Sequence, residues 1–86
     1  MEGKELDVVV LGATGVTGRR VAAYVAERAA EEGLRWGAAA RDATKLERTL
    51  GEVGATGGET IAVDTGDPEA LAAMALRAKV VLNLVG

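Results

Sequence analysis

The stretch from Val8 to Gly18, VVVLGATGVTG, constrains the fold of this chain more than any other. Its first four residues are apolar and do not alternate with polar ones, which is typical of a parallel strand buried on both faces. Three glycines then follow at intervals of three, and a strand interior has no use for them. Helix-forming residues run from Val16 to about Ala30, with Gly33 as a stop. The stretch therefore predicts a strand, a turn that needs bare backbone, and a helix.

The rest of the chain continues this alternation of strands and helices. Apolar runs, capping residues and helical spacing predict, in order, a strand at Leu34–Ala40, a helix from Lys45 to about Gly51, a flexible loop at Gly54–Gly58, a strand at Thr60–Val63, a helix after Asp67 and Pro68, and a strand at Lys79–Val85. Thr44 and Glu47 have the spacing of a capping box for the second helix. The order is β-α-β-α-β-α-β.

Two sets of residues are predicted to form the apolar faces of the first and third helices. They recur at helical spacing: Val21, Tyr24, Val25 and Ala29 in the first, and Leu71, Met74, Ala75 and Ala78 in the third. The only two aromatic residues, Tyr24 and Trp36, are interpreted as packing residues rather than catalytic or stacking ones.

This order of elements predicts an α/β fold with a parallel sheet, helices on both faces and right-handed crossovers. The leading topology is the first half of a doubly wound nucleotide-binding fold, with strand order 3-2-1-4. At 86 residues the chain holds one domain at most, residues 1–86, with one modest core.

The glycine turn is predicted to bind an anion, because free N–H groups at the start of a helix point toward the carboxyl edge of the sheet. The first glycine turns the chain, the second lets a pyrophosphate approach the backbone, and the third lets the helix pack on the strand. The candidate phosphate-binding residues are Gly12, Ala13, Thr14, Gly15, Val16, Thr17 and Gly18. In the alternative interpretation, the glycines bind nothing and serve only the tight turn and the close packing of the helix.

The residue that ends the second strand indicates which dinucleotide fits. An acidic residue there binds the 2′-hydroxyl of NAD, whereas an arginine pairs with the 2′-phosphate of NADP. Arg41 stands at this position and favours NADP, while Asp42 beside it keeps NAD possible. In the alternative interpretation both are solvated loop charges, with Asp42 helping to cap the next helix.

Three further polar or small residues are predicted to follow the strands at the same edge. Asp64 ends the third strand, where it either bonds the adenine amino group or serves a turn. Asn83 interrupts an apolar strand; as a buried amide it bonds neighbouring backbone, lines the nucleotide crevice with Val85 and Gly86, or does both.

Composition excludes several other functions. A net charge of −3, with acidic and basic residues mixed along the chain, argues against nucleic-acid partners. Without cysteine or histidine there are no disulfides, no thiol or imidazole chemistry and no common zinc ligand set. No apolar stretch approaches the ~18 residues of a membrane span, and the opening residues MEGKELD lack the basic and apolar regions of a signal peptide, so we expect a cytoplasmic protein. No acid–base pair emerges, and the catalytic residues stay unassigned.

Three segments together resemble a known family: VVLGATGVTG, LRWGAAARDATKLE and VDTGDPEALAAMALRAKVVLNLVG. In order and spacing they are similar to the amino-terminal part of saccharopine dehydrogenase-like oxidoreductases, a group that includes bacterial trans-acting enoyl reductases. The resemblance implies a nicotinamide-binding Rossmann domain with Gly12, Gly15, Gly18 and Arg41 in the cofactor positions. Ala40 departs from the family, which usually has glycine before the arginine and so leaves more room near the adenosine.

The family resemblance also implies a longer protein, because its members carry a separate substrate domain. We therefore expect this chain to be a fragment that binds NADP, or NAD, without catalysing a reaction alone. A non-catalytic NADP-sensing module and a fragment that binds nothing are the alternatives. The fourth strand would then be an unpaired edge, which predicts self-association through Val80–Val85.

Overall fold

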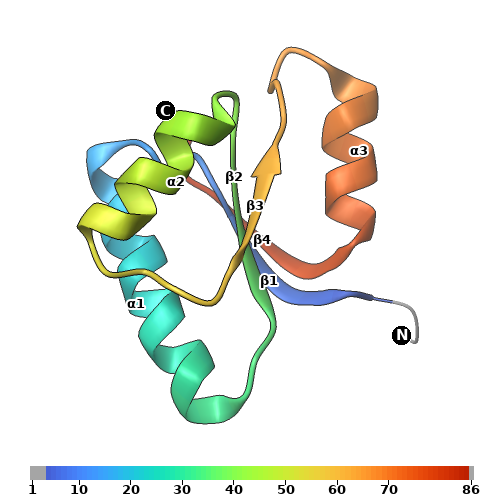
Figure 1. The fold of residues 1–86 in the computed structure, drawn as a ribbon. Helices are drawn as coiled ribbons and strands as arrows, with labels where there is room; N and C mark the ends of the chain where they lie inside the picture. The colour runs from blue at the N-terminus through green and yellow to red at the C-terminus, as the bar shows by residue number, and fades with distance from the viewer. Residues whose placement is uncertain (1–3, 86) are drawn as a thin grey trace.

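The computed structural model describes residues 4–85, which form four strands and three helices in the predicted alternating order (Figure 1). The elements are β1 (Leu6–Leu11), α1 (Val16–Glu32), β2 (Trp36–Ala40), α2 (Ala43–Glu52), β3 (Glu59–Ala62), α3 (Pro68–Leu76) and β4 (Ala78–Asn83). All pairs of neighbouring strands are parallel, and the order across the sheet is β3-β2-β1-β4. The predicted α/β fold and strand order are confirmed.

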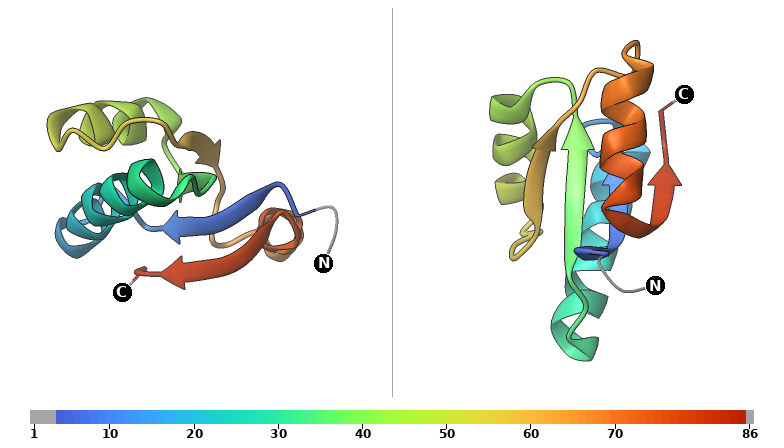
Figure 2. Two further views of the ribbon diagram at one scale, coloured as in Figure 1. Left: turned by 90° about the horizontal axis from the view of Figure 1, so that it is seen from below. Right: turned by 90° about the vertical axis from the view of Figure 1, so that its right-hand side faces the viewer.

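The helices cover both faces of the sheet. Helices α1 and α2 lie on one face and α3 lies on the other, as Figures 1 and 2 show. Each face has its own core. Val10, Ala22, Val25 and Leu46 belong to the core under α1 and α2, and Leu6, Val9, Leu11 and Met74 belong to the core under α3. Consecutive residues of β1 from Val8 to Leu11 thus supply opposite cores, which explains why this part of the strand is apolar without alternation.

Strand β2 is the element that sequence propensity favours least, yet all five of its residues are buried. Its alanines and Gly37 take up little volume between the two helical layers. A Cβ on Gly37 would lie 3.2 Å from the Cδ1 atom of Leu6 and 3.3 Å from the Cδ1 atom of Ile61. Trp36 is only 3% exposed, so its predicted packing role is confirmed.

The helix ends follow from local capping, with one correction. Gly33 ends α1 in the left-handed conformation at φ 71°, and Asp67 caps α3 by accepting from the N–H groups of Glu69 and Ala70. Helix α2 begins at Ala43 because Asp42, not Thr44, is its N-cap. The predicted capping box at Thr44 and Glu47 is therefore wrong: Asp42 offers a carboxylate two residues earlier and accepts from the Lys45 N–H at 3.0 Å.

Two predicted helix faces also need correction. Tyr24 is 62% exposed rather than packed, because the buried stripe of α1 consists of smaller residues at Ala22, Val25 and Ala26. Ala75 is exposed, and Ala78 already belongs to β4. Helix α3 instead turns Ala70, Leu71 and Met74 toward the sheet.

The carboxyl ends of the strands meet at one edge of the sheet, the upper edge in Figure 1. Leu11 is in register with Ala39 on one side and with Asn83 on the other. Just past the strands, Gly12 donates to the Ala39 carbonyl and Leu84 donates to the Leu11 carbonyl, both at 2.9 Å. The turn that follows β1 is therefore fixed between its two neighbouring strands. Among residues 4–85, no helix is long and apolar enough to cross a membrane.

Candidate functional site

The glycine turn leaves the sheet at its carboxyl edge, between the end of β1 and the start of α1. Gly12 has a φ of 89°, a conformation that residues with a side chain rarely adopt. A Cβ there would also lie 3.1 Å from the backbone of Leu84 and Val85. Gly12 is thus required both by its backbone conformation and by the chain that passes beside it after β4.

Gly18 is required for a different reason. It lies in the first turn of α1 and is buried against the glycine turn. A Cβ on Gly18 would meet the carbonyl group of Gly12, with the carbonyl carbon 2.8 Å away, and would lie 3.0 Å from the Cα of Ala13. These obstacles are backbone atoms, which cannot rotate away. The third glycine therefore has the close-packing role that its spacing predicts.

Gly15 has neither restriction. It is the N-cap of α1 with φ −73° and ψ 167°, which any residue can adopt. The one atom within 4 Å of a Cβ built there, apart from its chain neighbours, is the Gly12 oxygen at 3.7 Å. Nothing within the described fold demands a glycine at this position. The open space beside Gly15 is consistent with a bound ligand, rather than the chain itself, requiring a glycine at this position.

The start of α1 presents unpaired N–H groups beside this open space. The first helical hydrogen bond runs from the Arg19 N–H to the Gly15 carbonyl at 2.9 Å, so the N–H groups of Val16, Thr17 and Gly18 precede it. Helix α1 has no side-chain cap and no acidic residue in its first turn. The positive end of its dipole is therefore uncompensated, which favours an anion here.

A pocket of about 270 Å³ adjoins the turn at the carboxyl edge of the sheet. Four connections contribute to it, and its lining residues are Leu11, Gly12, Thr14, Gly15, Ala40, Arg41, Val63, Thr65, Leu84 and Val85. A larger hollow of about 530 Å³ lies between α1 and the segment after α2, lined mainly by small side chains and Tyr24. That hollow contains neither a helix N-terminus nor a basic side chain. The smaller pocket is therefore the candidate site for an anionic ligand.

Arg41 and Asp42 follow β2 directly, and their side chains make different interactions. The Arg41 side chain is 80% exposed, and its nearest ionic partner is Asp64, with the Nη2 atom 3.5 Å from Oδ1. Asp42 instead caps α2 through Oδ1. Arg41 thus lines the pocket, and its guanidinium has one loose ionic partner, whereas the neighbouring Asp42 carboxylate is engaged in the fold.

Asp64 is held by turn chemistry. Its Oδ1 atom accepts from the Gly66 N–H at 2.8 Å, which closes the turn between β3 and α3. This hydrogen bond, and then the charge of Arg41, hold the pKa of the Asp64 carboxyl below its ordinary value. Of the two predicted roles, the structure shows the turn. Contact with adenine stays a prediction.

Asn83 differs from the sequence expectation of a buried amide. It is exposed at the end of β4, where Oδ1 accepts from the Val85 N–H at 3.0 Å. Its carboxamide therefore bonds neighbouring backbone and is not part of the pocket lining. Strand β4 ends here, two residues before the predicted end, because this turn follows. Val85 does line the pocket, whereas Gly86 lies outside the described residues.

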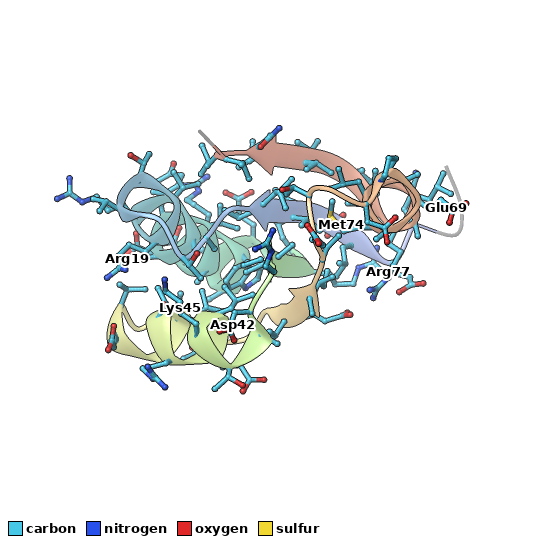
Figure 3. The ribbon with its side chains drawn as sticks, turned by 90° about the horizontal axis from the view of Figure 1, so that it is seen from above. Arg19, Asp42, Lys45, Glu69, Met74 and Arg77 are labelled. Carbon is cyan, nitrogen blue, oxygen red and sulfur yellow. The ribbon has the colours of Figure 1, made fainter. Side chains whose placement is uncertain are left out.

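Sequence reasoning missed several contributors to the site, among them Leu11, Val63, Thr65, Leu84 and Arg19. Leu84 and Thr65 line the pocket through loops whose course depends on the strand order. Arg19 reaches back from α1 and donates from Nη2 to the Thr14 carbonyl at 3.1 Å. The position of Arg19 directly after Gly18 is the feature of the sequence that could have indicated a role at the turn. Figure 3 looks down on the carboxyl edge and shows Arg19 of α1 on the same side of this view as Asp42 and Lys45 of α2, away from the labelled residues of α3 and its end.

Comparison with known proteins gives a family match and one relative. The family described as the saccharopine dehydrogenase NADP binding domain matches residues 8–86. A Caenorhabditis elegans protein named "Lipid droplet localized protein" is 37% identical over an alignment of 86 positions, which covers 93% of this chain and 20% of the relative. The chain thus spans about a fifth of the length of this curated relative.

Proposed function

The chain belongs to the family of saccharopine dehydrogenase NADP-binding domains, and on this premise we propose that it is the cofactor-binding part of an NADP-dependent oxidoreductase. The resemblance to this family, noted from three sequence segments, is confirmed by the match over residues 8–86. The family's cofactor is NADP, in agreement with the identity of Arg41. Within the protein, NADP supplies hydride-transfer chemistry when it is bound.

The observation that carries the proposal is the contrast among the three glycines. Gly12 and Gly18 are needed by the chain's own backbone, whereas at Gly15 the backbone has room for a methyl group. An approaching pyrophosphate supplies the missing reason for a glycine at that position. It would accept from the free N–H groups at the start of α1, with Thr14 and Thr17 as additional donors.

Arg41 is the proposed partner of the 2′-phosphate. Arg41 lines the pocket just past β2, and Asp64 at 3.5 Å is a weak competitor for its guanidinium because both side chains are largely exposed. A phosphate dianion offers paired acceptors to the fork of the guanidinium. Asp42, the residue that keeps NAD possible, uses Oδ1 to cap α2. These facts favour NADP over NAD at this site.

The test is a titration of the chain with NADPH and with NADH. We expect the unmodified chain to bind NADPH more tightly, and Arg41→Ala to lose about 10- to 100-fold in NADPH affinity, the value of one charge-assisted phosphate contact, while its NADH affinity is unchanged. Arg48→Ala, an exposed arginine on α2, is the matched control and should change neither. Equal loss of both cofactors in Arg41→Ala, or no loss, would contradict the assigned role.

Catalysis is proposed for the longer protein rather than for residues 4–85. Hydride transfer needs a substrate held against the nicotinamide, and a substrate domain elsewhere in the protein would provide it. The chain alone should therefore bind NADPH without turning it over. A non-catalytic NADP sensor makes the same prediction for the isolated chain. The two are separated by testing whether the full-length protein oxidises NADPH when candidate substrates are added.

We also propose that the isolated chain associates with a second copy through β4. This strand is an edge of the described sheet, paired with β1 alone, and Val80 is 51% exposed on it. Unpaired N–H and C=O groups along such an edge are a template for another strand. Sedimentation should show a concentration-dependent dimer that Val80→Lys weakens. A clean monomer at high concentration would refute this proposal.

A further inference from the structure

Arg19 makes one contact that links helix α1 to the glycine turn. Its Nη2 atom donates to the Thr14 carbonyl at 3.1 Å, and the side chain is partly buried. The Nε atom is buried and has no hydrogen-bond partner among the described residues. The ion pairs found within residues 4–85 do not include Arg19. A charged group is thus held partly out of water with little internal compensation, which indicates a role other than stability.

The bond from Arg19 fixes the peptide unit at which the turn becomes a helix. This unit joins Thr14 to Gly15, and both of its polar groups are engaged. The carbonyl accepts from Arg19, and the Gly15 N–H donates to the Gly12 carbonyl at 3.3 Å. Glycine permits a wide range of backbone angles, so without the bond from Arg19 only the 3.3 Å bond from the Gly15 N–H restrains the rotation of this peptide unit. Rotation would turn a carbonyl oxygen toward the space that an anion occupies, and the two would repel.

We propose that Arg19 is a positioning residue for the cofactor pyrophosphate, an inference that rests on the proposed function. Arg19 holds the Thr14 carbonyl on the helix side of the turn, and so keeps this oxygen away from an anion bound at the N–H groups at the start of α1. Its uncompensated positive charge lies at the same end of the helix and adds to the attraction for a phosphate.

The experiment compares two ligands that share a 2′-phosphate and differ in the pyrophosphate. NADPH has both groups, whereas adenosine 2′-monophosphate has only the first. We expect Arg19→Ala to weaken NADPH binding about tenfold, in the range of a charge-assisted hydrogen bond, and to leave adenosine 2′-monophosphate within about twofold. Arg41→Ala should weaken both ligands. Arg20→Ala, an exposed arginine on the next position of the same helix, is the matched control and should weaken neither.

A second measurement needs no ligand and reads the turn directly. In NMR relaxation-dispersion experiments, the Gly15 amide should show exchange on the μs–ms timescale in Arg19→Ala, and not in the unmodified chain or in Arg20→Ala. Unchanged NADPH affinity in Arg19→Ala, an equal loss for the two ligands, or an undisturbed Gly15 amide would overturn the inference. If the unmodified chain does not bind NADPH, the proposed function fails, and the Gly15 amide still decides whether Arg19 holds the turn.

Discussion

Replacing Gly15 with alanine separates what the fold needs from what the cofactor needs. The backbone of Gly15, at φ −73° and ψ 167°, suits alanine. A Cβ at this position would be 3.7 Å from the Gly12 oxygen, an ordinary van der Waals distance. The variant should therefore fold as the unmodified chain does.

The expected free-energy change is small because two effects oppose each other. Alanine is a poorer N-cap than glycine by roughly 0.5–1 kcal/mol. Alanine also restricts the unfolded chain, which stabilises the fold by roughly 0.4–1 kcal/mol. The free energy of unfolding should thus change by no more than about 0.5 kcal/mol. Binding is different, because the methyl group stands where the pyrophosphate approaches. Losing one backbone bond to a charged phosphate weakens NADPH binding about 10- to 100-fold.

Two assays on the same samples test this reasoning: urea unfolding for stability, and calorimetric titration with NADPH for binding. Gly18→Ala is the contrasting variant. Its methyl group meets the backbone of Gly12 and Ala13, so α1 must shift, and overpacking of this kind costs about 1–3 kcal/mol. If Gly15→Ala binds NADPH as tightly as the unmodified chain, or unfolds as easily as Gly18→Ala, then Gly15 is a structural glycine and the reasoning is wrong.

Three further predictions concern the fold around the site. Gly51→Ala, in α2 with no atom within 4 Å of the added methyl group, should raise the free energy of unfolding by roughly 0.5–1 kcal/mol without changing NADPH affinity. Asp67→Ala should lower it by about 1 kcal/mol in the same urea assay, because α3 loses the cap on two N–H groups. A hydrogen bond from the Arg35 N–H, and then Lys79, hold the pKa of Asp7 below its usual 3.8. The Asp7 carboxylate therefore stabilises the fold fully above pH 3.8, and this contribution is lost as the pH falls through the lowered pKa. In Asp7→Asn, the free energy of unfolding should accordingly fall less steeply between about pH 5 and about pH 2 than in the unmodified chain. An unchanged dependence on pH would count against this role of the Asp7 carboxylate.

The fold was predictable because its strongest signals are local. Largely apolar strands, glycine and aspartate caps and the alternation of elements together predict a parallel sheet of order 3-2-1-4. The glycine spacing also indicated the turn at the carboxyl edge. Strand β2 was harder, because its burial depends on the two helical layers and not on the strand propensity of alanine.

The side chains at the site were less predictable, because their roles depend on partners distant in the sequence or on the exact turn. Asn83 was expected to be buried and is exposed, because β4 ends in a turn that its carboxamide closes. Asp42 caps α2 two residues before Thr44, the residue that the capping-box pattern indicates. The bond from Arg19 to the Thr14 carbonyl needs the exact path of the turn, which spacing alone does not supply.

The measurement that tests the account most directly is an NMR titration of the chain with NADPH that follows every backbone amide. If the turn after β1 binds the pyrophosphate, the largest shifts will be those of the amides from Gly15 to Gly18, followed by Arg41. Shifts concentrated at the hollow between α1 and the segment after α2, around Tyr24 and Val53, would contradict the account, and so would no shifts at millimolar NADPH.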